Sequence, residues 1–221
     1  MTRIRIKCCG MTRVEDAMLA ARLGADAIGV VLTARSKRQV PLVQARKIVA
    51  AMPPFVATVA LFMDDDVDLV RRALDEVRPT LLQFHGSEPD DWCAQFGHPY
   101  LKAVAMGGGA AALPHLRDYP QAAALLLDGH GIGEAGGSGR AFDWSLLPAD
   151  LMQPWILAGG LNPDNVAAAI RMAPPWAVDV ASGIEVSPGI KDAVKMAAFI
   201  AAVRQASSQE RHPRDPAFRI E

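Results

Sequence analysis

Residues 155–184 read WILAGGLNPDNVAAAIRMAPPWAVDVASGI, and this stretch decides the fold class. A short β-rich run, Trp155 to Leu157, precedes a glycine turn and an amphipathic stretch from Pro163 to Met172. A second β-rich run, Ala177 to Val180, follows, and a second glycine loop comes directly after it. Two β-rich runs joined by a helix form a βαβ unit, so the two strands are expected to be parallel.

The same alternation of short β-rich runs and longer amphipathic stretches extends over the whole chain. Six further runs predict strands at Ile4 to Cys9, Ala27 to Leu32, Val56 to Phe62, Leu81 to Phe84, Leu101 to Ala105 and Ala123 to Leu127. The stretches between the strands predict helices at Val14 to Leu23, Leu42 to Ala51, Val67 to Val77, Asp90 to Phe96, Ala111 to Leu116, near Trp144 and Lys191 to Arg204. Eight similar units favour an α/β fold with a single (β/α)8 TIM barrel over an open doubly wound sheet.

The domain organisation follows from where this pattern ends. We expect one catalytic barrel over residues 1–206. Residues 207–221, SSQERHPRDPAFRIE, are polar, interrupted by prolines and without a hydrophobic period, which is typical of a flexible tail.

Composition and charge limit the class of partner. The 23 Lys and Arg are scattered and balanced by 24 Asp and Glu, so no basic stripe for nucleic acid is present. No run approaches the roughly 18 apolar residues of a membrane span, and the alternating N-terminus is unlike a signal peptide. Three cysteines, two of them adjacent, fit a reducing cytoplasm better than a disulfide framework, and metal-ligand spacing is absent. We expect a cytoplasmic protein with a small-molecule partner, as a monomer or a homodimer.

Cys9 is the first candidate for chemistry. In the first strand, side chains alternate, so Lys7 and Cys9 share one face while Ile6 and Cys8 share the other. The aliphatic face belongs beneath the helices, which directs Cys9 into the barrel at its carboxyl-terminal mouth, where barrel enzymes work. A helix begins shortly afterwards, and its N-terminus would favour the thiolate. Cys8 and Cys93 are expected to be buried hydrophobes.

Other polar residues stand at or near strand ends. Asp128 ends an apolar run, where partial burial would suit a general acid, although a turn-forming aspartate before glycine would have the same pattern. Arg38, in the basic cluster after the second strand, could clamp an anionic substrate or could simply be solvated. For His85, Asp179 and Lys7 the residues alone favour a structural role.

Three glycine-rich segments are candidates for backbone contacts to a ligand. Gly159 and Gly160 follow the seventh strand, and Ser182 and Gly183 follow the eighth, which is the recurrent phosphate site of barrels. The third segment, Gly136 to Arg140, has neither a P-loop lysine nor GxGxxG spacing, and it predicts a mobile loop over the mouth.

Eight motifs, in one order along the chain, resemble the phosphoribosylanthranilate isomerase family over about Ile4 to Ile200. They are Lys7-Cys8-Cys9-Gly10-Met11-Thr12, Gly24-Ala25-Asp26-Ala27-Ile28-Gly29, Ser36-Lys37-Arg38, Gln83-Phe84-His85-Gly86, Leu126-Leu127-Asp128, Gly136-Gly137-Ser138-Gly139, Gly159-Gly160-Leu161-Asn162-Pro163 and Asp179-Val180-Ala181-Ser182-Gly183-Ile184-Glu185. Any one motif would be weak, but the ordered set is specific.

The resemblance implies an Amadori rearrangement in tryptophan biosynthesis. N-(5-phosphoribosyl)anthranilate would become 1-(2-carboxyphenylamino)-1-deoxyribulose 5-phosphate without metal or organic cofactor. It also implies Asp128 as general acid, Cys9 as general base and Arg38 at the anthranilate carboxylate. The phosphate would bind at Gly159, Gly160, Ser182 and Gly183, and Asp179 and His85 would support the substrate.

The chain departs from the family pattern at two positions, and two rival functions stay open. Cys8 replaces an aliphatic residue, and Ala181 replaces a serine in the last loop, but neither change removes a proposed catalytic group. One rival is another aminoaldose isomerase on the same barrel, although such enzymes usually pair two aspartates. The other is a barrel that binds a sugar phosphate without converting it.

Overall fold

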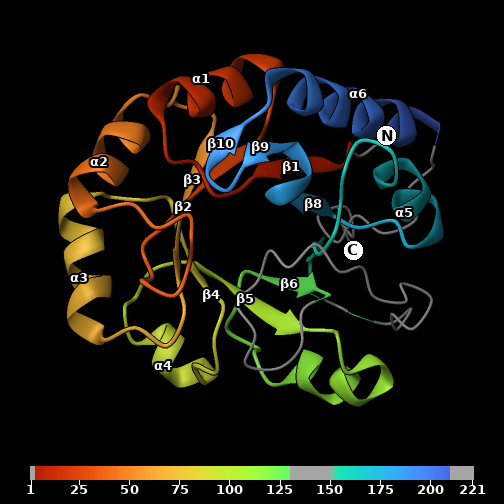
Figure 1. Ribbon diagram of the computed structural model, residues 1–221. Helices are drawn as coiled ribbons and strands as arrows, with labels where there is room; N and C mark the ends of the chain where they lie inside the picture. Colours follow the sequence, from red (N-terminus) through yellow and green to blue (C-terminus); the bar gives the residue numbers. More distant parts are fainter. Residues whose placement is uncertain (1–2, 130–150, 152, 210–221) are drawn as a thin grey trace, which may run out of the picture.

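The computed structural model describes residues 3–129, 151 and 153–209, and its centre is a closed barrel of parallel strands in chain order (Figure 1). The strands are β1 (Arg5–Cys8), β2 (Ala27–Val31), β3 (Ala57–Phe62), β4 (Leu81–Phe84), β5 (Tyr100–Ala105), β6 (Ala124–Asp128), β7 (Trp155–Leu157) and β8 (Ala177–Val180). β8 pairs in parallel with β1, with Lys7 opposite Asp179, and this pairing closes the barrel. The predicted (β/α)8 fold is confirmed, and no strand end differs from its predicted position by more than one residue.

Helices surround the barrel in Figure 1. They are α1 (Val14–Leu23), α2 (Leu42–Ala50), α3 (Val67–Glu76), α4 (Asp90–Ala94), α5 (Val166–Met172) and α6 (Ala193–Gln209), together with the 3-10 helices η1 (Gly109–Arg117) and η3 (Ser182–Ile184). The sequence pattern predicts a helix over Ala111 to Leu116, and the structure has the 3-10 helix η1 there, because Pro114 lies inside it and lacks an N–H for an α-helical hydrogen bond. The helix predicted near Trp144 lies outside the described residues, as does the loop Gly136 to Arg140.

Two helices have an end that lies three or more residues from the predicted one. α5 begins at Val166 instead of Pro163, because the Asn162 side chain accepts hydrogen bonds from the N–H groups of Asp164 and Asn165 and holds a turn there. α6 continues to Gln209, past the expected domain boundary at residue 206. Ser207 contributes to the barrel, since its hydroxyl accepts a hydrogen bond from the N–H of Ile4 at 3.3 Å.

Alternation along the strands separates two apolar layers. Ile6, Cys8 and Phe62 belong to the cluster between the barrel and its helices. Leu126 and Ile156 belong to a second, smaller cluster inside the barrel. Inward-facing positions near the carboxyl ends of the strands therefore carry the polar groups of the barrel mouth.

A two-stranded antiparallel hairpin, which the sequence did not predict, follows β8. It consists of β9 (Glu185–Ser187) and β10 (Ile190–Lys191) and lies beside β1 and α6 (Figure 1). None of the helices in the described part of the chain has the length and apolar character needed to cross a membrane.

Candidate active site

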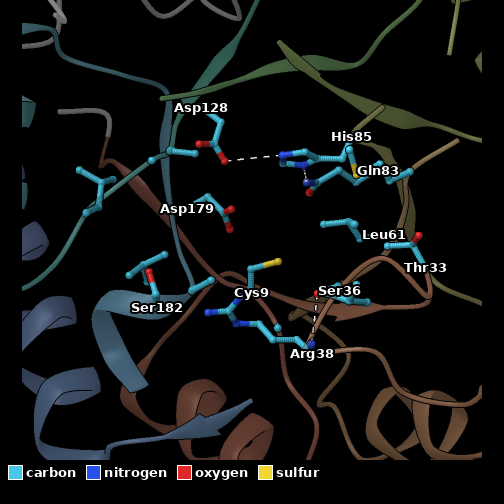
Figure 2. A pocket seen from close by; sticks show the side chains of 18 of the residues that line it. Cys9, Thr33, Ser36, Arg38, Leu61, Gln83, His85, Asp128, Asp179 and Ser182 are labelled. Carbon is cyan, nitrogen blue, oxygen red and sulfur yellow. Dashed lines mark hydrogen bonds and ion pairs between the residues drawn. The ribbon is translucent and has the colours of Figure 1, made fainter. Parts of the chain in front are cut away.

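A pocket at the carboxyl ends of the strands brings most of the predicted site residues together (Figure 2). Its lining includes Cys9, Arg38, His85, Asp128, Asp179, Gly159, Gly160 and Ser182. The Cys9 thiol and the carboxyl groups of Asp128 and Asp179 lie around the same opening in Figure 2. Gly183 was also predicted to contact a ligand, but it lies outside the lining and packs behind it.

Cys9 follows β1 directly and is held between the neighbouring strands. Its N–H donates to the carbonyl of Val180 at 2.8 Å, and its side chain lies against Gly29 of β2. A Cβ atom at Gly29 would come within 2.7 Å of the Cys9 sulfur, so only glycine leaves the thiol its present place. Burial raises the pKa of the Cys9 thiol above its ordinary value, while the Lys7 ammonium opposes that rise.

A buried ion pair lies one side-chain layer below Cys9. Lys7 Nζ and Asp179 Oδ1 are 2.8 Å apart, and the two side chains are 4% and 10% exposed. Burial alone would lower the pKa of Lys7, but the charge of Asp179, together with that of the Cys9 thiolate when it forms, outweighs burial and raises the pKa. Lys7 therefore remains a cation beneath the thiol, and Asp179 is a partner of Lys7 as well as part of the pocket wall.

Asp128 lies on the opposite side of the pocket, at the end of β6. Its Oδ2 is 3.6 Å from Nε2 of His85, which follows β4, and both residues are buried. His85 Nδ1 is in turn 3.0 Å from Nε2 of Gln83, a fully buried residue of β4. Gln83 belongs to one of the motifs that resemble the family, but the sequence alone assigned it no role. Its spacing of two from His85 puts both side chains on one face of the strand.

The loop after His85 is fixed by charged groups that the sequence did not single out. The Glu88 carboxylate accepts hydrogen bonds from the N–H groups of Asp64 at 2.7 Å and Gly86 at 2.9 Å. Lys102, whose side chain is completely buried, donates to Glu88 at 3.0 Å. This network joins the loops after β3 and β4 and so holds the backbone next to His85.

Arg38 lines the pocket, but part of its guanidinium is already engaged. Its Nε and Nη2 donate to the two Glu185 carboxylate oxygens at 2.8 Å each. Burial would raise the pKa of Glu185, yet hydrogen bonds from Arg38 and the charge of Lys191 outweigh it and lower the pKa. Within the described residues the remaining guanidinium donors of Arg38 have no hydrogen-bond partner, so they could bind a ligand.

Lys191, from the hairpin, connects this ion pair to two loops of the pocket. Its Nζ donates to Glu185 at 2.8 Å, to the carbonyl of Cys9 at 2.6 Å and to the carbonyl of Ala181 at 3.1 Å. Glu185 was part of a quoted motif, whereas no signal in the sequence distinguished Lys191. Only the folded structure shows that the hairpin supports the loop at Cys9, the candidate base.

The two glycine loops after β7 and β8 lie backbone to backbone. Gly159 and Gly160 have φ angles of 84° and 66°, which L side chains rarely adopt. A Cβ atom at Gly183 would come within 2.0 Å of the carbonyl oxygen of Leu161. Gly183 therefore permits the close approach of the loops, and Gly159, Gly160 and Ser182 face the pocket.

The chain is similar to known proteins over most of its length. The family described as N-(5'-phosphoribosyl)anthranilate (PRA) isomerase matches residues 6–202. A relative of that name from Stenotrophomonas maltophilia is 51% identical over 207 residues, covering 92% of this chain and 94% of its own.

Two solved structures are similar over the whole barrel. A phosphoribosyl anthranilate isomerase in complex with reduced 1-(o-carboxyphenylamino)-1-deoxyribulose 5-phosphate is 34% identical, with a TM-score of 0.78. Monomers of the dimeric isomerase of Thermotoga maritima are 33% identical, also with a TM-score of 0.78. Each match covers 91% of this chain and 99% of the other. The chain belongs to the N-(5'-phosphoribosyl)anthranilate isomerase family.

Proposed function

We propose that this isomerase converts N-(5'-phosphoribosyl)anthranilate to 1-(2-carboxyphenylamino)-1-deoxyribulose 5-phosphate with Asp128 as general acid and Cys9 as general base. The observation that carries the proposal is that the two groups, from β6 and β1, face one pocket backed by the paired glycine loops. An acid and a base with separate tasks must reach the sugar from different sides, and these two residues line different parts of the pocket wall. The names of the relatives supply the substrate, and we assign the reaction to tryptophan biosynthesis on the family resemblance.

The first step opens the ribose ring. Asp128 gives its proton to the ring oxygen while the bond from that oxygen to C1 of the sugar breaks. The lone pair of the anthranilate nitrogen forms a double bond to C1, which yields a protonated Schiff base. His85, 3.6 Å from the Asp128 carboxyl, is placed to interact with the carboxylate that this step leaves.

The second step removes the proton from C2 of the sugar. The Cys9 thiolate takes this proton, and the electron pair of the C–H bond moves toward the Schiff base to give an enolamine. Loss of the C2 hydroxyl proton and protonation of C1 then give the ketone. The steps transfer protons and rearrange bonds within the substrate without an external oxidant or reductant, so this chemistry needs no metal or organic cofactor.

Binding groups are available for both ends of the substrate. We assign the phosphate to the backbone of Gly159 and Gly160 and to Ser182, with Gly183 setting the spacing of the loops. The donors of Arg38 that Glu185 leaves available would bind the anthranilate carboxylate. Asp179 acts mainly by pairing with Lys7. This ion pair makes Asp179 a poorer base than Cys9, which argues against an enzyme that uses two aspartates as its acid and base.

The test follows the fluorescence of phosphoribosylanthranilate generated in place, which decays as the substrate is converted. We expect Cys9→Ala and Asp128→Ala each to lower kcat/KM by about 10²- to 10⁴-fold with the fold retained, as for loss of a general acid or base. Cys8→Ala is the matched control and should stay near the wild-type rate, because Cys8 faces the helices.

Two results would decide against the proposal. Equal loss of activity in Cys8→Ala would contradict the assignment of Cys9 as base. Slow decay at the spontaneous rate in the unmodified protein would leave a barrel that binds sugar phosphates without converting them.

A further inference from the structure

Gln83 is the residue of β4 that lines the pocket, two positions before His85, and the proposed mechanism does not use it. Its side chain is completely buried, and its Nε2 lies 3.0 Å from Nδ1 of His85. The other amide atom, Oε1, is buried and has no hydrogen-bond partner within the described residues. Two features of this amide therefore need an explanation.

The first feature is the contact to His85. An amide NH2 group can only donate hydrogen bonds, so Nδ1 of His85 must accept and cannot carry a proton. The proton of a neutral imidazole then lies on Nε2, the atom that is 3.6 Å from the Asp128 carboxyl. Gln83 thus fixes which imidazole nitrogen presents an N–H to the acid.

The second feature is the unpartnered amide oxygen. Leaving a buried carbonyl oxygen without a hydrogen bond is costly, so such an atom in a pocket wall calls for a partner from the ligand. A carbonyl oxygen only accepts hydrogen bonds. Ionised phosphate and carboxylate groups offer no donor, so the donors of the proposed substrate are the sugar hydroxyls and the anthranilate N–H. Of these, the hydroxyls are the donors that every pentose phosphate carries, and we assign the contact to one of them.

We propose that Gln83 is a positioning residue that holds His85 in its Nε2-protonated tautomer facing Asp128 and accepts a hydrogen bond from a hydroxyl of the bound pentose phosphate. The inference rests on the proposed function for the identity of the ligand. The Gln83 amide also couples binding of the sugar to Asp128, because the same side chain contacts the sugar and orients the histidine. After ring opening, the Nε2–H would stabilise the Asp128 carboxylate.

The tautomer is tested without turnover, by ¹H–¹⁵N correlation spectra of the imidazole groups in the protein labelled at histidine. The His85 signals are identified by their loss in His85→Asn. We expect the Nε2–H tautomer in the unmodified protein and a protonated Nδ1 in Gln83→Glu, whose carboxylate would accept from that atom. A protonated Nδ1 in the unmodified protein, or an unchanged tautomer in Gln83→Glu, would overturn the assignment.

The hydroxyl contact is tested by calorimetric titration with ribose 5-phosphate and with inorganic phosphate. Gln83→Met keeps an unbranched side chain and removes the amide, so we expect about 3- to 10-fold weaker binding of ribose 5-phosphate with phosphate binding unchanged. Gln95→Met, at an exposed glutamine outside the pocket, is the control. Equal affinity of Gln83→Met and the unmodified protein for ribose 5-phosphate would overturn the contact.

These measurements separate the inference from the proposed function. An enzyme that turns over phosphoribosylanthranilate while both Gln83 measurements fail would keep the function and lose the inference. A protein that fails to turn over this substrate but gives both expected Gln83 results would keep the site as one for another pentose phosphate.

Discussion

The environment of the Cys9 thiol acts on its pKa in two opposite directions. Burial raises its pKa, which makes the thiolate a stronger base but a rarer species at neutral pH. Lys7, two residues earlier on the same face of β1, lowers the pKa and is itself held as a cation by Asp179 at 2.8 Å. The pKa of the Cys9 thiol therefore depends on the charge of a lysine side chain that is almost completely buried.

A pH titration tests this electrostatic role of Lys7. Because the thiolate is the reactive form and its pKa is raised, the rate of alkylation of Cys9 should rise with pH through and above neutrality. In Lys7→Met the opposing cation is lost, so the midpoint of alkylation by iodoacetamide should move to higher pH. The measurement uses a background with Cys8→Ala and Cys93→Ala.

The matched control for this titration is the double variant Lys7→Met with Asp179→Asn, which leaves no unpaired carboxylate behind. It should retain most of the shift, because the cation and not the aspartate favours the thiolate. An unchanged alkylation midpoint in both variants would mean that the charge of Lys7 does not affect the pKa of the Cys9 thiol.

At the scale of elements, the pocket depends on how closely the β7 and β8 loops approach. The contact joins backbone to backbone, since a Cβ atom at Gly183 would meet the carbonyl oxygen of Leu161 at 2.0 Å and the Cα of Asn162 at 2.9 Å. Backbone atoms cannot rotate away as a side chain would. Any larger residue at position 183 must push the loops apart.

Gly183→Ala should therefore weaken phosphate binding rather than abolish the chemistry. We expect a KM raised about tenfold or more and inhibition by inorganic phosphate weakened in parallel, with a smaller change in kcat, because the separated loops no longer present their N–H groups together. Steady-state kinetics with phosphate as inhibitor measure both. Gly108→Ala is the control, since a Cβ atom there would meet nothing within 4 Å. Loss of kcat alone, with normal phosphate inhibition, would contradict this account.

At the scale of the whole molecule, the barrel was predictable because each of its strands carries a local signal. Short apolar runs at regular spacing predicted all eight strands, and alternation within β1 separated Cys8 from Cys9. The glycine loops were predictable for the same reason, since glycine marks backbone that must bend or approach closely.

Contacts between distant segments were not predictable in this way. The bonds from Lys191 to Cys9 and from Arg38 to Glu185 join residues 182 and 147 positions apart, and no local pattern specifies them. The hairpin β9–β10 is too short to give a clear period. Arg38 could be predicted as an anion-binding residue from its place on a loop, but its partner could not.

The packing of the whole barrel also makes the free energy of unfolding depend on pH in the alkaline range. Cys8 is completely buried in the layer between barrel and helices, and burial raises the pKa of its thiol from 9.0 to about 12. Between these values the unfolded chain loses the proton while the folded protein keeps it, so the free energy of unfolding falls as pH rises. The decrease for one such group is about 1.4 kcal/mol per pH unit.

Urea unfolding under reducing conditions at pH 8 and pH 10 should therefore show a larger decrease in the free energy of unfolding in the unmodified protein than in Cys8→Ala. Lysine and tyrosine ionisation are common to both proteins, so the difference between their slopes isolates Cys8. Parallel slopes would mean that the thiol ionises in the folded barrel as readily as in the unfolded chain.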